Sequence, residues 1–356
     1  MKHLSLSALA AVGVLAGMTA ANAADLGGNC CADLEERIAE LEATTVRKGN
    51  RKVSLTVSGF VAQQVIAWDD GVKSKAYVAD TGSVSIGSNV SFSGKAQISP
   101  DVSAGYVLQL ELIKDDPLLQ GQNSSATTGS LLGGGGGATV LQSFWYLKSE
   151  HLGKLSVGLQ SSAVDNQAIL PDASGSLIQA NYVIYDAQGF FNRINGRAVG
   201  STWGSLGSCK TLINAQAAVV ADCDGFPNNN VRYDSPTIAG FSGSVSWGES
   251  NIWGFSGRYS GETPDFKFNA AVAYVENDDA NFNPLISLTG LGGGVGIVAP
   301  NGLDASAIQV GAYLQHIPTG LFVYGAYGHD FNDSVGGLNV LGQKQQDGDN
   351  YYIKGG

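Results

Sequence analysis

The chain has 356 residues, a formal net charge of −11 and 49 glycines, and only 14% of its residues are charged. The acidic balance and the lack of a basic stripe exclude a nucleic-acid-binding protein. Beyond the N-terminus, no apolar run reaches the roughly 18 residues that a membrane-spanning helix needs. Two classes remain, a β-rich soluble protein and an outer-membrane β-barrel.

Residues 1–23 have the three parts of a secretory signal peptide. Lys2 and His3 form the positive start, residues 4–17 form the apolar region, and residues 21–23 form a small-residue cleavage site. The alternative is an N-terminal core helix. The signal predicts export and removal of this segment.

An exported chain can form disulfides, and this chain has four cysteines. Cys209 and Cys223 lie close in sequence and are a candidate disulfide. Cys30 and Cys31 are neighbours and are poorly placed to pair with each other, so they either cross-link subunits or stay reduced. None of the spacings matches a zinc site.

Residues 33–47 are the one convincing helix, and residues 24–50 form a linker that contains it. A short heptad seam is formed by Leu34, Ile38, Leu41 and Thr45. We expect a short periplasmic coiled coil between barrel subunits. The alternative is a solvated helix packed on the rim of the barrel.

From residue 51 onward, apolar and polar residues alternate in segments of about ten residues, the length of a tilted strand that crosses a bilayer. The clearest segment is 83–99, in which Val84, Val90 and Phe92 share one face with other apolar residues. The predicted strands are 53–68, 83–99, 104–112, 140–149, 154–160, two in the hairpin 230–247, then 253–259, 266–274, 308–314, 321–328 and one that begins at 351.

The segments between these strands alternate between short turns and long loops. The predicted long loops are 69–82, 115–138, 161–229, 277–304 and 329–348. One connection, 248–251, is short where the alternation predicts a loop. This rhythm is typical of bacterial outer-membrane barrels, so we predict an all-β, transmembrane antiparallel β-barrel over residues 51–356. Its apolar side chains face lipid, and its serines, amides and charges face a wet lumen.

Three stretches resemble the alphaproteobacterial porin family found in rhizobia and related bacteria. They are residues 30–42 leading through 48–53 into Ser58-Gly59-Phe60, residues 153–160, and residues 231–236 with Ala239-Gly240-Phe241. Many porins have Gly-Arg where this chain has Gly158-Leu159, so one common constriction arginine has no counterpart here. The resemblance covers essentially the whole mature chain.

The resemblance implies a sixteen-stranded barrel that assembles as a homotrimer in the outer membrane. The sequence ends part-way into a strand and without the usual terminal aromatic residue. We therefore expect a chain truncated at its C-terminus, with about twelve of sixteen strands present. The alternative is a complete twelve-stranded barrel.

The resemblance also implies a passive channel for ions and small hydrophilic solutes. In related porins the loop after the fifth strand folds into the lumen, and residues 161–229 occupy that place as the constriction loop. Acids facing bases across a narrow gap would set the selectivity. We expect the constriction at Asp165, Asp172, Asp186, Arg193 and Arg197, and charged wall groups at Lys95, Glu111, Arg258 and Lys267. For each residue the alternative is a solvated loop charge. The acidic excess predicts a weak preference for cations.

Other functions find less support in the sequence. A structural or adhesive barrel with partner-binding loops stays open as an alternative. An enzyme is not expected, because the histidines are scattered and no Gly-x-Ser-x-Gly elbow is present. The glycine run 133–137 lacks the Lys-Ser/Thr pair of a phosphate loop. We predict no cofactor and no metal.

Overall fold

The computed structural model describes residues 53–81, 87–113, 115, 121–122, 137–175, 189–202, 227–248, 251–277, 305–332 and 347–356. All of these belong to the unit Lys52–Gly356. The described residues form sixteen strands and no α-helix, which confirms the all-β prediction. They contain no helix long and apolar enough to cross a bilayer. The predicted signal peptide, the helix at 33–47, and the four cysteines lie outside them.

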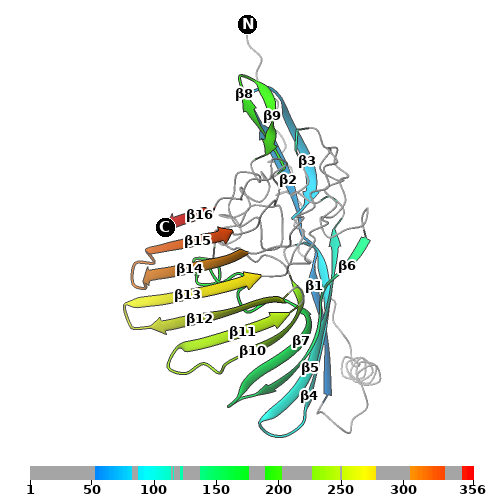
Figure 1. Ribbon diagram of the computed structural model, residues 1–356, viewed down its shortest axis with the longest axis vertical. Helices are drawn as coiled ribbons and strands as arrows, with labels where there is room; N and C mark the ends of the chain where they lie inside the picture. The colour runs from blue at the N-terminus through cyan, green and yellow to red at the C-terminus, as the bar shows by residue number, and fades with distance from the viewer. Residues whose placement is uncertain are drawn as a thin grey trace, which may run out of the picture. The chain divides into compact units, whose positions relative to one another are not determined.

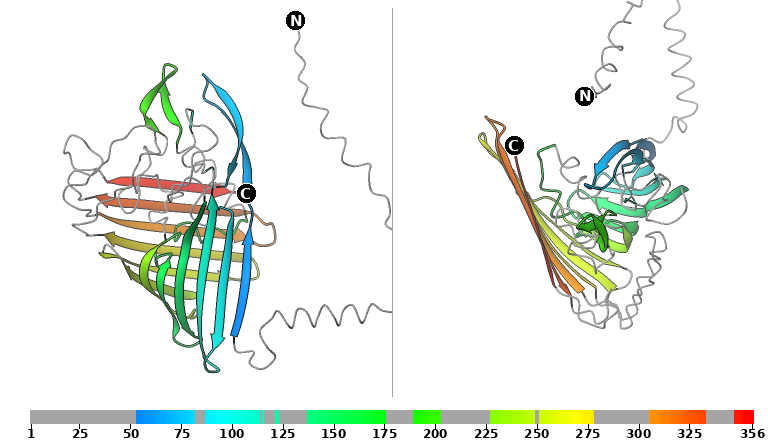
Figure 2. Two further views of the ribbon diagram at one scale, coloured as in Figure 1. Left: turned by 90° about the vertical axis from the view of Figure 1, so that its right-hand side faces the viewer. Right: turned by 90° about the horizontal axis from the view of Figure 1, so that it is seen from above.

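Twelve strands form one antiparallel sheet, in which each strand pairs with its neighbours in chain order (Figures 1 and 2). β1 and β16 stand at the two ends of this order, so the described strands do not close the predicted barrel. The twelve strands are β1 (Val53–Phe60), β4 (Asn89–Gln97), β5 (Val102–Ile113), β6 (Gly137–Ser149), β7 (Gly153–Gln160), β10 (Asn228–Asp234), β11 (Phe241–Gly248), β12 (Ile252–Glu262), β13 (Phe266–Asn277), β14 (Ala305–His316), β15 (Phe322–Asn332) and β16 (Gly348–Gly355).

Two hairpins lie outside this sheet and correct the sequence prediction. β2 (Gln63–Asp69) pairs with β3 (Ser74–Asp80), and β8 (Phe191–Ile194) pairs with β9 (Arg197–Thr202). We predicted a loop over 69–82 and no strands in 161–229. The prediction was wrong for β3 because the turn is shorter than expected. Gly71 takes a φ of 78°, and its N–H donates to Asp69 Oδ1 at 2.8 Å.

The strand register gives the sheet two chemically different faces. Paired residues on antiparallel strands point to the same side, so each row across the sheet shares one face. One row runs Leu55, Gly94, Tyr106, Trp145, Val157, Val231, Trp247 and Trp253. Leu55 is 62% exposed and Trp247 is 59% exposed. We call this apolar side the outward face, and it matches the predicted lipid-facing surface.

The adjacent row lies on the opposite side and is polar. It runs Lys95, Gly105, Tyr146, Ser156, Arg232, Ser246 and Gly254. We call this side the inner face. Ser156 is fully buried and Ser246 is 8% exposed. A polar, covered side behind an exposed apolar side is the reverse of a soluble sandwich and is the pattern of a membrane barrel.

Short turns join the strands in pairs at one end of the sheet. They connect β4 to β5, β6 to β7, β10 to β11, β12 to β13 and β14 to β15 (Figure 1). At the other end, the connection from β11 to β12 is also short, as the sequence indicated. There Asn251 has a φ of 52°, and its Oδ1 accepts a hydrogen bond from Trp247 Nε1 at 3.3 Å.

Candidate functional site: the inner face and the segment laid across it

Residues 161–174, which we call the inner segment, leave β7 and pack against the inner face. Backbone turns shape them: the N–H groups of Ile169 and Leu170 both donate to Asn166 O, at 3.0 and 2.9 Å. Asn166 has a φ of 61°, a left-handed conformation that asparagine tolerates better than most residues. Ala163, Val164 and Ala168 are fully buried, so this segment is part of the packed structure.

Two serines of the inner face hold the start of the inner segment. The N–H of Ala163 donates to Ser246 Oγ on β11 at 2.9 Å. The hydroxyl of Ser256 on β12 donates to Ala163 O at 2.7 Å. The backbone N–H and C=O of the buried Ala163 are therefore both satisfied by wall side chains, as a buried backbone requires.

Gln309 and Tyr324 hold the middle of the inner segment. Gln309 Nε2 on β14 donates to Val164 O at 2.8 Å, and its Oε1 accepts from the N–H of Ala168 at 3.0 Å. Tyr324 on β15 donates its hydroxyl to Ala168 O at 2.5 Å. Gln309 is 1% exposed and Tyr324 is fully buried. The amide side chain of Gln309 thus binds the segment at two points.

Two glycines let the segment approach the wall. A Cβ atom at Gly254 would lie 2.7 Å from Val164 Cγ1. A Cβ atom at Gly311 would lie 2.2 Å from Ala168 O, which is closer than van der Waals contact allows. Any other residue at position 311 would push the segment away from β14.

Charged groups hold both ends of the inner segment. At its start, Arg232 Nη1 donates to Ser161 O at 3.1 Å and to Ser162 O at 2.8 Å. The same guanidinium pairs with Asp234 through Nη2 at 2.7 Å. At its end, Lys354 on β16 forms an ion pair with Asp172. The segment is therefore fixed from β10 to β16.

Two of the predicted constriction acids are buried, and one of them binds the wall. The side chain of Asp172 is 1% exposed and is paired with Lys354. Asp165 is 6% exposed, and its Oδ1 accepts from Asn166 Nδ2 at 2.8 Å. Leu170, at 51% exposure, is the most exposed side chain of the buried run 162–170. Asp186 lies outside the described residues.

The predicted constriction bases lie in another place, on the β8–β9 hairpin. Arg193 pairs with Asp70 of the β2–β3 turn at 2.7 Å, and the described ion pairs join it to neither Asp165 nor Asp172. Arg197 follows at the start of β9. The structure thus does not bring these predicted acids and bases together, and their joint role stays a prediction.

The β2–β3 turn and the β8–β9 hairpin form a cluster of their own. Partial burial raises the pKa of Asp70. The N–H of Lys73, the Arg193 guanidinium and the N–H of Val72 outweigh that effect, and they lower the pKa from 3.8 to about 2. The rings of Trp68 and Phe190 meet edge to face at 5.3 Å.

All four predicted wall residues lie on the inner face by register. Lys95 pairs with Ser54 and Gly105. Arg258 donates through Nε to Gln167 Oε1 of the inner segment at 2.6 Å. Glu111 is 1% exposed and accepts from the N–H of Gly87 at 3.2 Å, and Lys267 is half-buried on β13.

Sequence reasoning missed Arg232, Gln309 and Lys354. Each is a long polar side chain on the inner face, and the inner-facing neighbours of Gln309 along β14, Ala307 and Gly311, are small. That contrast was the available signal. A long polar side chain beside small ones indicates that this wall residue contacts another part of the chain. The sequence does not identify that partner.

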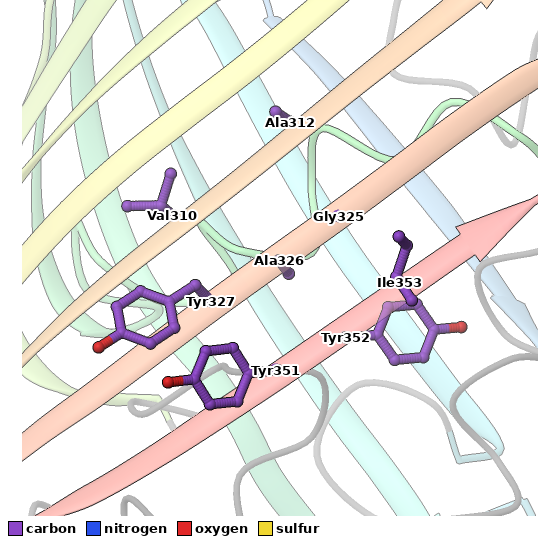
Figure 3. Close-up of a pocket in the computed structure, with 8 residues that line it drawn as sticks. All are labelled: Val310, Ala312, Gly325, Ala326, Tyr327, Tyr351, Tyr352 and Ile353. Atoms are coloured by element: carbon purple, nitrogen blue, oxygen red, sulfur yellow. The ribbon is translucent and has the colours of Figure 1, made fainter.

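An apolar groove of about 400 Å³ lies on the outward face over β14 to β16 (Figure 3). Its floor is Gly325, which has no side chain, and its sides include Val310 and Ile353. The rings of Tyr327 and Tyr351 lie 5.1 Å apart along one side. Tyrosines on a lipid-facing surface are typical of the aromatic belt of membrane proteins.

The sequence matches the family described as Gram-negative porin over residues 6–356. Similar solved structures include OmpT, an outer membrane protein of Vibrio cholerae, at 11% identity and a TM-score of 0.42, with 80% of this chain and 66% of that chain covered. Salmonella typhi OmpF in complex with daunomycin has 13% identity and a TM-score of 0.34, with 84% and 86% covered. A mutant of the Rh. blastica porin has 11% identity and a TM-score of 0.33, with 80% and 86% covered.

The chain therefore spans slightly less than two thirds of the Vibrio cholerae structure and 86% of the other two. No curated protein sequence matches it significantly. The family match itself extends over nearly the whole sequence, from residue 6 to residue 356. The chain belongs to the Gram-negative porin family and is a porin of the bacterial outer membrane.

Proposed function

We propose that the protein forms a water-filled channel through which ions and small hydrophilic solutes pass by passive diffusion. The observation that carries this proposal is the inner segment laid across the polar face of a sheet whose other face is apolar. A segment on the inner side narrows a channel, whereas a partner-binding loop of an adhesive barrel would be displayed outside it. The position of residues 161–174 therefore favours a channel over the adhesive alternative.

We further propose that wall groups of the inner face contact the solute. Lys95 and Lys267 are the strongest candidates, because both are at least partly exposed and neither has an ion pair among the described residues. Arg258 and Glu111 contribute mainly to holding the structure, since both are engaged with other groups. Rings of charged side chains are a common means of selection in pores.

The sequence resemblance to alphaproteobacterial porins supports two finer proposals. The chain is a member of the alphaproteobacterial branch of the family, and it assembles as a homotrimer. The apolar outward face then contacts either lipid or a neighbouring copy.

Planar-bilayer recording of the purified full-length protein tests the proposed function. We expect stepwise, ohmic conductance, and we expect vesicles that contain the protein to swell in solutions of small sugars. Folding is checked first by the shift in gel mobility that folded barrels show before heating. A correctly folded protein that stays silent in the bilayer contradicts the channel and leaves the adhesive barrel.

A further inference from the structure

We propose that the ion pair between Lys354 and Asp172 is the anchor that keeps the inner segment against the wall and so sets the width of the channel. Lys354 is a positioning residue, which acts through the segment and not by touching solute. The inference rests on the proposed function, because a channel width has meaning only if the protein conducts.

The surroundings of the Lys354 ammonium are closed on several sides. Its Nζ pairs with Asp172 and donates to Ser174 Oγ at 2.8 Å. The rings of Phe322 and Tyr324 lie 6.0 and 5.7 Å from it, within the range of cation–π attraction. The lysine side chain is 12% exposed and the carboxylate 1% exposed. This is a built site, in which the ion pair is enclosed by a hydroxyl group and two aromatic rings.

The place of the pair in the chain explains why an anchor is needed there. The start of the inner segment follows β7 directly, so the strand itself holds residue 161 near the wall. Asp172 lies more than ten residues further on, and 182 residues separate it from Lys354 in sequence. The pair is a charged link between this part of the segment and β16.

The other contacts of the segment do not replace this link. Gln309 and Tyr324 bind the backbone at Val164 and Ala168, which lies four residues before Asp172. Pro171 O accepts a hydrogen bond from Asn269 Nδ2 at 3.1 Å, a neutral contact that a water molecule can replace. When one partner of a buried ion pair is removed, the remaining charge is buried without compensation and moves toward water.

Lys354→Met and Asp172→Asn should each raise the population of the released segment by roughly 100- to 1,000-fold, the range that corresponds to breaking a buried ion pair. In single-channel recordings, this appears as larger open-channel current noise and closure at lower voltage. Lys354→Arg keeps the charge and should stay close to wild type. The double variant Lys354→Asp with Asp172→Lys restores a pair of opposite charges. It should therefore recover part of the low current noise and of the high closing voltage of the wild type.

The matched control is Lys267→Met, which removes a lysine from the inner face without touching the inner segment. We expect it to change ion selectivity and to leave current noise and closing voltage as in wild type. All variants are selected for folded mobility before recording. Where Lys354→Met fails to fold, Asp172→Asn decides alone, because the asparagine has nearly the same shape and removes only the negative charge.

The outcomes separate the two proposals. A folded wild-type protein that never conducts overturns the proposed function. A conducting wild type whose Asp172→Asn and Lys354→Met variants have the same noise and closing voltage overturns the anchor and leaves the channel intact. Equal effects of Lys354→Met and Lys267→Met also overturn it, because they would trace the change to lost charge and not to position.

Discussion

At the scale of single residues, the direction of a side chain matters more than its charge. Of the three acids predicted for the constriction, Asp165, Asp172 and Asp186, the first two are buried, and Asp172 is paired with Lys354 of the wall. Leu170 is 51% exposed between them. Leu170 is therefore the exposed side chain of the buried run 162–170, and the Asp172 carboxylate is used to attach the segment to the wall.

Leu170→Asp should make the channel more selective for cations. A unit charge about 4 Å from a passing ion is worth roughly 1 kcal/mol in water, which corresponds to about a fivefold change in the ratio of cation to anion permeability. The reversal potential in a potassium chloride gradient measures this ratio. Leu170→Asn is the control of similar size without charge, and it should leave the potential unchanged. An unchanged potential in Leu170→Asp would mean that position 170 does not face the ion path.

At the scale of elements, the two hairpins outside the sheet are joined through one ion pair. Arg193 of β8 binds Asp70 of the β2–β3 turn. The side-chain amide of Gln122 binds both the N–H and the C=O of Phe191, through two hydrogen bonds of 2.8 Å. These contacts join segments from three different connections. The cluster therefore behaves as one small unit, and loss of the ion pair should loosen it as a whole.

This loosening should depend on pH in a defined direction. The pKa of Asp70 is lowered in the folded protein, so the ion pair is at full strength above pH 3.8 and is lost as the pH falls toward about 2. The hydrogen-exchange protection of residues 63–80, relative to the intrinsic exchange rate at each pH, should fall over that interval. In Arg193→Ala the protection should be lower at neutral pH and should change less on acidification. Arg197→Ala, on the same hairpin, is the control and should match wild type.

At the scale of the whole molecule, the alternation of the strands decides which face meets lipid. On β5, Leu108 pairs with Phe92 on the outward face, and Gln109 pairs with Ser91 on the inner face. The two residues are neighbours in sequence and lie on opposite sides of the sheet. They offer a direct comparison of the two environments within one strand.

Leu108→Arg should destabilise the folded protein in lipid by about 2–4 kcal/mol near the bilayer midplane, because an arginine there faces acyl chains. Gln109→Arg places the same side chain on the wet face and should cost much less. Urea titration of folding into lipid vesicles measures both free energies. Equal costs for the two variants would contradict the assignment of the faces.

The sequence predicts the strands well and the inner segment poorly, for a physical reason. A strand carries a period of two, so the faces of Phe92, Leu110 and Val272 could be assigned from spacing alone. The inner segment has no period, and its conformation depends on contacts with distant strands. Neither Gln309 nor Lys354 could be matched to its partner from the sequence, because more than a hundred residues separate each pair.

The attachment of the inner segment to the last described strand has a consequence for the order of assembly. Residues 161–174 are synthesised before β10 to β16 exist, but their partners are distributed over those strands up to Lys354. Contacts between residues so far apart in sequence form late, because the chain between them must be ordered first. We therefore expect the segment to become attached in steps during biogenesis, first to β10, β11 and β12, then to β14 and β15, and last to Lys354 of β16.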